Sequence, residues 1–68
     1  MKIKEIYSVN VQIVDRGITF PLSKEIEVHP PIHRNVKAFL DKNRYAMDLT
    51  TKFSFEITSS KFIGVGTL

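Results

Sequence analysis

The chain has 68 residues and no cysteine, which indicates one small domain over residues 1–68 with neither a disulfide nor a thiolate-bound zinc. Hydrophobic residues make up 43% of it, which argues against disorder, and the formal net charge is +3. The N-terminal residues alternate in polarity, unlike a signal segment, and no apolar run approaches the ~20 residues of a membrane helix. We therefore expect a soluble cytoplasmic protein without membrane contact.

Two strands joined by a tight turn are predicted at the beginning of the chain. Apolar and polar residues alternate over 2–14 and again over 18–28, which is the period of a half-buried strand. A two-residue loop at Arg16-Gly17 keeps the apolar residues of both strands on one face. This register pairs Ile13 with Phe20, Val11 with Leu22 and Tyr7 with Ile26.

The prolines after His29 end the second strand, and a helix is predicted over 31–43. Ile32, Val36, Phe39 and Leu40 fall within an arc of roughly 100°, as in a helix with one buried face. We expect Phe39 to pack on the sheet against Val11, Phe20 and Phe53 or Phe55.

The rest of the chain predicts a second hairpin, with strands over 48–58 and 61–67 and a turn at Ser59-Ser60. In one register Phe55 lies opposite Gly64, where an aromatic ring can cover the glycine. The alternative register buries Ile63 and Val65 instead.

These elements predict an α+β fold in the order ββαββ. One four-stranded antiparallel sheet in the order 2-1-3-4 would carry the helix on one face, with a right-handed crossover. Pro21 lacks a backbone donor, which favours an edge position for the second strand. The other face would be open or covered by a second copy.

The basic residues of the predicted helix are the first candidate binding site. The entire net charge lies in residues 33–44 (HRNVKAFLDKNR). Such a positive element is suited to phosphate or an acidic protein surface. Alternatively it is a solvated face on which Asp41 pairs with Lys37 and Arg44. The candidate partner-binding residues are Arg34, Lys37, Lys42 and Arg44.

The last predicted strand is the second candidate. Residues 62–68 contain no charged side chain, whereas natural edge strands are usually guarded by charge, proline or bulges. Ile63 and Val65 are therefore candidate contacts for a partner strand or a second copy. The alternative is a short strand covered by local packing.

Chemistry-bearing motifs are missing from the sequence. It contains no nucleophile elbow, no glycine-rich phosphate loop and no zinc-protease motif. His29 and His33 are separated by Pro30-Pro31, which prevent a regular helix through both, and no cysteine completes a ligand set. We expect no enzyme activity, no metal and no cofactor.

The sequence therefore favours a small non-catalytic protein that binds another protein, as an inhibitor, adaptor or assembly factor, through an acidic surface of that partner. The alternative is a nucleic-acid-binding regulator that uses the basic segment 33–44. Salt discriminates the two, because three or four phosphate contacts predict a log–log slope of about −3 on duplex DNA.

Overall fold

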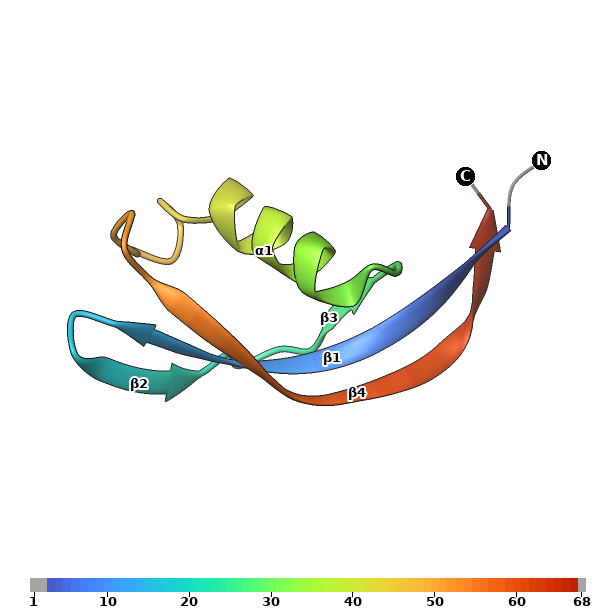
Figure 1. Ribbon diagram of the computed structural model, residues 1–68, viewed down its shortest axis with the longest axis horizontal. Helices are drawn as coiled ribbons and strands as arrows, with labels where there is room; N and C mark the ends of the chain where they lie inside the picture. Colours follow the sequence, from blue (N-terminus) through green and yellow to red (C-terminus); the bar gives the residue numbers. More distant parts are fainter. Residues whose placement is uncertain (1–2, 68) are drawn as a thin grey trace.

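The computed structural model describes residues 3–67, with Thr67 described by its backbone alone. Its elements form an α+β fold, an antiparallel sheet of four strands with one helix over one face (Figure 1). The predicted strand start at Lys2 and the C-terminal Leu68 lie outside the described residues. In chain order the elements are β1 (Ile3–Asp15), β2 (Ile18–Pro21), β3 (Ile26–Val28), α1 (Ile32–Lys42) and β4 (Ser54–Thr67).

The sheet is built around β1, which pairs with β2 and β3 along one edge and with β4 along the other. The α+β class is confirmed, but the predicted order 2-1-3-4 and the arrangement ββαββ are wrong in detail. The predicted strand 18–28 is divided into β2 and β3. Residues 54–58 and 61–67 of the two predicted strands belong to the single strand β4, so no hairpin turn occurs at Ser59-Ser60, and residues 48–53 are turns and irregular backbone instead of the predicted strand.

The turn between β1 and β2 confirms the predicted two-residue loop. Arg16 and Gly17 have φ of 55° and 75°, as the inner residues of a type I′ hairpin require. Ile13 lies opposite Phe20 as predicted, and the Leu22 N–H donates to the Val11 carbonyl at 2.9 Å.

The predicted pairing of Tyr7 with Ile26 is wrong by two residues. Tyr7 lies opposite Val28, and Val9 lies opposite Ile26. The cause is the irregular segment 22–25, which bends out of the sheet between β2 and β3. A shift of two residues keeps every side chain on its own face, so the apolar pattern is unaffected by it.

The pairing of β4 with β1 contains two irregularities. Val11 lies opposite Ile57 and Asn10 opposite Ser59, which leaves Thr58 as an extra residue. Nearer the C-terminus, Tyr7 lies opposite Phe62 and Ile6 opposite Gly64, which leaves Ile63 as an extra residue. Each β-bulge changes the alternation of β4 by one residue. Ile6, and not the predicted Phe55, is therefore the residue opposite Gly64.

The core lies between α1 and the sheet. Val36 and Leu40 of the helix are completely buried, against Val9 and Ile13 of β1. Phe39 is 40% exposed and lies beside Leu22 and Ile26, so the prediction that it packs in the core against Val11, Phe20 and Phe53 or Phe55 is wrong. The buried stripe of the helix is centred between Val36 and Leu40, and Phe39 lies on its flank, toward the segment that joins β2 to β3. The other buried apolar residues are Val11, Ile26, Val28, Leu49 and Phe53.

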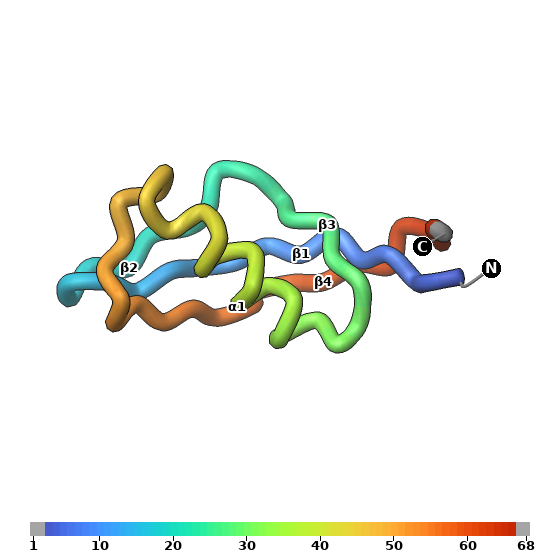
Figure 2. Tube along the Cα trace, turned by 90° about the horizontal axis from the view of Figure 1, so that it is seen from above, coloured from blue at the N-terminus to red at the C-terminus, as the bar shows by residue number. Residues whose placement is uncertain are grey.

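The molecule is elongated, with principal extents of 42 × 20 × 16 Å. The helix covers only part of this length, as the view from above shows (Figure 2). Beyond it, residues 3–7 of β1 and 62–67 of β4 continue as a pair of strands, which β3 adjoins only at Tyr7, and curve toward the helix side (Figure 1). We call these two segments the terminal ribbon.

Candidate interaction surfaces

The four basic residues predicted as a binding site, Arg34, Lys37, Lys42 and Arg44, differ in their contacts. The Lys37 ammonium contacts Asp41 at 2.8 Å and lies 4.7 Å from the ring centroid of Phe53. The Arg44 guanidinium lies over the ring of Tyr45 at 4.7 Å. Within residues 3–67, Arg34 and Lys42 form no ion pair. Of the predicted four, only Lys37 forms an ion pair within residues 3–67, and the two unpaired cations that lie on α1 itself are Arg34 and Lys42.

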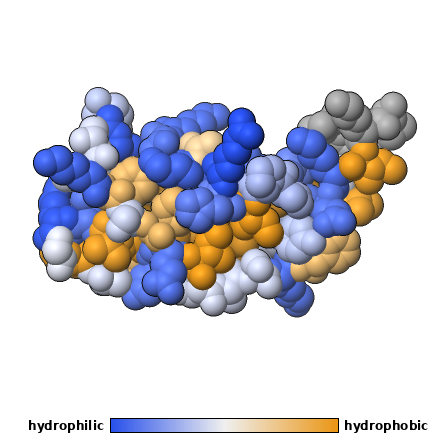
Figure 3. Space-filling model, viewed as in Figure 1, coloured by the Kyte–Doolittle hydropathy of each residue, from blue (hydrophilic) through white to orange (hydrophobic). Residues whose placement is uncertain are grey.

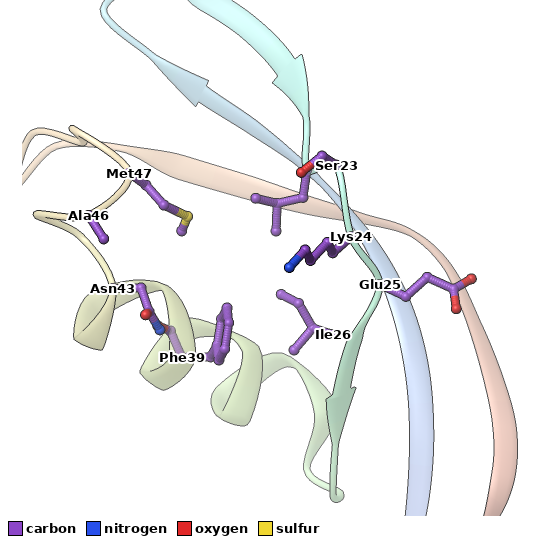
Figure 4. Close-up of a pocket in the computed structure, with 9 residues that line it drawn as sticks. Ser23, Lys24, Glu25, Ile26, Phe39, Asn43, Ala46 and Met47 are labelled. Atoms are coloured by element: carbon purple, nitrogen blue, oxygen red, sulfur yellow. The ribbon is translucent and has the colours of Figure 1, made fainter.

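A shallow pocket of about 380 Å³ lies between the C-terminal half of α1, the segment 43–47 and the connection from β2 to β3 (Figure 4). Its walls are mainly apolar, and the Lys24 side chain points into it while Glu25 points away. Its volume is near the lower limit for small-molecule sites. Sequence reasoning missed this pocket because it took 22–25 as regular strand. The apolar lining residues are Leu22, Ile26, Phe39, Ala46 and Met47.

A second cluster joins the β1–β2 turn to the segment before β4. The Asp15 carboxylate is 5% exposed and accepts hydrogen bonds from the Thr50 hydroxyl and the Thr50 N–H, at 2.5 and 2.9 Å. These hydrogen bonds hold the pKa of Asp15 below its ordinary value. Arg16 bridges the cluster at 4.0 Å from Asp15 and 3.5 Å from Asp48. The Asp15 carboxylate is therefore a structural link between the β1–β2 turn and the segment before β4.

The sheet face away from the helix is polar and bonded to itself. Ser8 donates to Glu25 at 2.7 Å, and the Asn10 amide donates to Glu25 at 3.4 Å and to Ser59 at 2.9 Å. These bonds connect the irregular segment 22–25 to β1 and β4. Within residues 3–67 the aromatic residues of the paired strands lie on the helix side, so this face presents none of them as a platform on which a base could stack.

The terminal ribbon carries four of the eight large hydrophobic residues that are exposed among residues 3–67. Val65 is 64% exposed, Phe62 51% and Ile63 46%, and Ile3 of β1 is 68% exposed. Figure 3 shows hydrophobic surface at this end of the molecule, apart from that beneath the helix. The predicted residues Ile63 and Val65 thus lie on the same strand of the ribbon, whereas the basic residues Arg34 and Lys42 lie on the helix. Sequence reasoning missed Phe62 and Ile3, because their alternation placed them inward.

The ribbon is held in shape by contacts between its own residues and β3. The rings of Tyr7 and Phe62 meet edge to face with centroids 5.5 Å apart. The Tyr7 hydroxyl donates to the Glu5 carboxylate at 2.8 Å, and this bond raises the pKa of Tyr7. An Nδ1 of His29, just after β3, lies 3.2 Å from the Glu5 carbonyl oxygen. The exposed apolar residues therefore belong to an ordered surface.

The outer edge of β4 is the second feature of this surface. Among residues 3–67, β4 pairs with β1 alone, and none of the turn and loop backbone hydrogen bonds involves it. Its charged residues are Glu56 and Lys61. The backbone groups along this edge are available to another strand.

The histidines take part in structural contacts. His33 stacks on Phe55 with centroids 4.7 Å apart, and His29 contacts the ribbon as described above. In the part of the chain that the structure describes, no three His, Asp or Glu side chains come together as a metal site. No helix within residues 3–67 has both the length and the apolar content needed to cross a membrane.

Comparisons of the chain with models of protein families, with curated proteins and with solved structures find no match. Function is therefore argued from the surfaces themselves.

Proposed function

We propose that this chain is a non-catalytic protein that acts by binding another polypeptide along the outer edge of β4 and the terminal ribbon. The observation that carries the proposal is the exposure of Phe62, Ile63 and Val65, between 46% and 64%, on a strand with one unpaired edge. An apolar strand at a sheet edge is normally guarded against pairing. Residues 62–67 of β4 carry no charged side chain and only the bulge at Ile63 guards them, which supports strand addition to a partner.

Two kinds of contact would contribute to this binding. The backbone of β4 would supply hydrogen bonds of the sheet type, and the exposed side chains of the ribbon would supply apolar area and selectivity. The net charge of +3 lies in residues 33–44 and not on β4, so it would speed the approach of an acidic partner without entering the strand pairing itself.

The test is capture of a partner from an extract of the native host, treated with nuclease, by the tagged wild-type chain and by two variants of it. The variant Ile63→Lys/Val65→Lys places two charges on the ribbon, and Arg34→Gln/Lys42→Gln is the matched control on the helix. Captured proteins are quantified by mass spectrometry, and binding is repeated with the purified partner. We expect at least about a tenfold loss of affinity for the ribbon variant, equivalent to 1.4 kcal/mol, and about wild-type affinity for the control.

Undiminished binding by the folded ribbon variant would contradict the proposal. Circular dichroism of each variant provides the folding control, since Ile63 and Val65 are exposed and their replacement should leave the core intact.

Nucleic-acid binding by the helix is the second candidate function, and the unpaired charges of Arg34 and Lys42 favour it. Two phosphate contacts on duplex DNA predict a log–log salt slope of about −1.8. The variant Arg34→Gln/Lys42→Gln should then abolish nuclease-sensitive binding, whereas Ile63→Lys/Val65→Lys should leave it unchanged. A measured slope near zero would contradict this function.

A further inference from the structure

We propose that the polypeptide bound along the outer edge of β4 is a second copy of this chain, an inference that rests on the proposed function. The two β4 strands pair antiparallel about a two-fold axis that passes between Thr58 and Ser59. In this register Glu56 of each copy lies opposite Lys61 of the other, and Phe55 lies opposite Phe62. The two sheets join into one continuous sheet with both helices on the same side.

The placement of charge on β4 is the first argument. Glu56 lies opposite Gln12 of β1, and Lys61 lies opposite Ser8, so both charged side chains are on the face away from the helix. Their odd separation along a regular strand would put them on opposite faces, and the bulge at Thr58 brings them to the same one. A two-fold axis perpendicular to the sheet then creates two Glu–Lys pairs on that face. Opposite charges across paired strands are stabilising, and like charges are destabilising.

The aromatic residues of β4 give a second, independent match. Phe55 lies opposite Ile13 and Phe62 opposite Tyr7, so both rings are on the helix side of the sheet. The register that pairs the charges also pairs these rings, again twice. Phe55 already stacks on His33 and Phe62 already contacts Tyr7. The dimer would therefore join two aromatic pairs into one row and cover Phe62, which is 51% exposed.

The two ends of the β4 segment that would pair lie at equal distances along the chain from the same two-fold axis. β4 begins at Ser54, and its second bulge is at Ile63. The segment between these points is centred between Thr58 and Ser59, where the charge pairs also place the axis. The central bulge of one copy then lies opposite that of the other. An isologous contact of this kind closes at two copies and does not extend into a fibre.

The experiment measures the oligomeric state of the purified chain by sedimentation equilibrium from about 1 to 500 μM. We expect wild type to dimerise, and Glu56→Lys and Lys61→Glu each to weaken the dimer at least about tenfold, since each creates two like-charge pairs. A mixture of the two variants should dimerise with about wild-type affinity, because every pair across the heterodimer is again of opposite sign. The double variant Glu56→Lys/Lys61→Glu should also recover the dimer.

Thermal unfolding of each variant shows whether the monomer is intact. A wild-type chain that stays monomeric over the whole range would overturn the dimer. Equal dimer affinity of wild type and both single variants, or a mixture that stays monomeric, would overturn the register and with it this proposal. The proposed function is tested by a different measurement: it is contradicted if Ile63→Lys/Val65→Lys still captures every partner. Failure of the dimer and failure of the proposed function can therefore be distinguished.

Discussion

The part of β1 and β4 under the helix differs from the part that forms the terminal ribbon, although the same two strands run through both. Under the helix, Val9 and Val11 are no more than 2% exposed, whereas Ile3 in the ribbon is 68% exposed. At about 3.3 Å per residue the 13 residues of β1 span roughly 43 Å. At about 1.5 Å per residue the 11 residues of α1 span roughly 16 Å.

The difference teaches that the length of the helix decides which apolar residues of the strands are buried. Alternation is the same in both parts, but a helix of this length covers less than half of the sheet. The apolar residues beyond its N-terminal end remain on the surface. Stability and binding should therefore separate along the length of the molecule.

The largest expected effect is on the covered part. Leu40→Ala removes a completely buried side chain of the helix, and we expect it to lower the free energy of unfolding by about 3 kcal/mol, from lost apolar burial and an unfilled cavity. Urea unfolding followed by circular dichroism measures this loss. A loss below about 1 kcal/mol would mean that the helix does not depend on the sheet for its stability.

A smaller loss is expected at Phe39, on the flank of the same helix. Its side chain is 40% exposed, so Phe39→Ala should cost about 1–2 kcal/mol, less than the roughly 3–5 kcal/mol typical of a fully buried phenylalanine. The comparison with Leu40→Ala in the same urea experiment is the check. A larger loss for Phe39→Ala than for Leu40→Ala would contradict the position of the buried stripe.

A pH-dependent effect is expected at the end of the covered part, where Asp15 links the turn to Thr50. Because the pKa of Asp15 is lowered in the folded protein, its stabilising contribution is complete above its ordinary value of 3.8. This contribution is lost as the pH falls through the lower folded value. Asp15→Asn should therefore unfold at a lower temperature than wild type near neutral pH, and the difference should shrink in acid.

The control for Asp15→Asn is Asp48→Asn. The Asp48 side chain is 90% exposed, and its carboxylate also contacts Arg16. We expect this change to shift the melting temperature less than Asp15→Asn does near neutral pH. Equal shifts of the melting temperature for the two variants near neutral pH would show that the Asp15–Thr50 hydrogen bonds add no measurable stability.

The smallest effect on stability is expected in the ribbon. Val65→Ala should change the free energy of unfolding by less than about 0.5 kcal/mol, because Val65 is 64% exposed. Val9→Ala is the matched substitution under the helix, where complete burial should make the cost about 2 kcal/mol. Similar costs for the two valines, measured at a concentration where the chain is monomeric, would contradict the contrast between ribbon and core.

The elements that could be predicted are those whose residues are close in sequence. The Arg16-Gly17 turn fixes the pairing of Ile13 with Phe20, and alternation fixes which face of β1 is buried. The shift at 22–25 could not be predicted, since moving by two residues leaves all faces unchanged. The sequence does not distinguish the bulge at Thr58 from the predicted turn at Ser59-Ser60, because either one reverses the alternation of apolar and polar residues along the strand.

The candidate surfaces were predicted in part. The uncharged end of β4 pointed to Ile63 and Val65, which are exposed as an edge strand allows. Phe62 and Ile3 are exposed beside them because the helix does not extend over this end of the sheet. The alternation within each strand does not indicate how much of the strand the helix covers. The contact of Lys37 with Phe53 could not be predicted from the basic segment, because the two residues are distant in sequence.

The long pairing of β1 with β4 has a consequence for folding kinetics. Its nearest partners in sequence are Val14 and Ser54, and its most distant are Ile3 and Thr67, so every pair in it closes a long loop. The β1–β2 hairpin and the helix contain only local contacts and can form early. Such a topology predicts slow folding for a chain of this size, with β4 joining last.

Phe55→Ala should then accelerate unfolding and leave the folding rate nearly unchanged in a stopped-flow chevron, whereas a matching slowdown of folding would place β4 in the transition state.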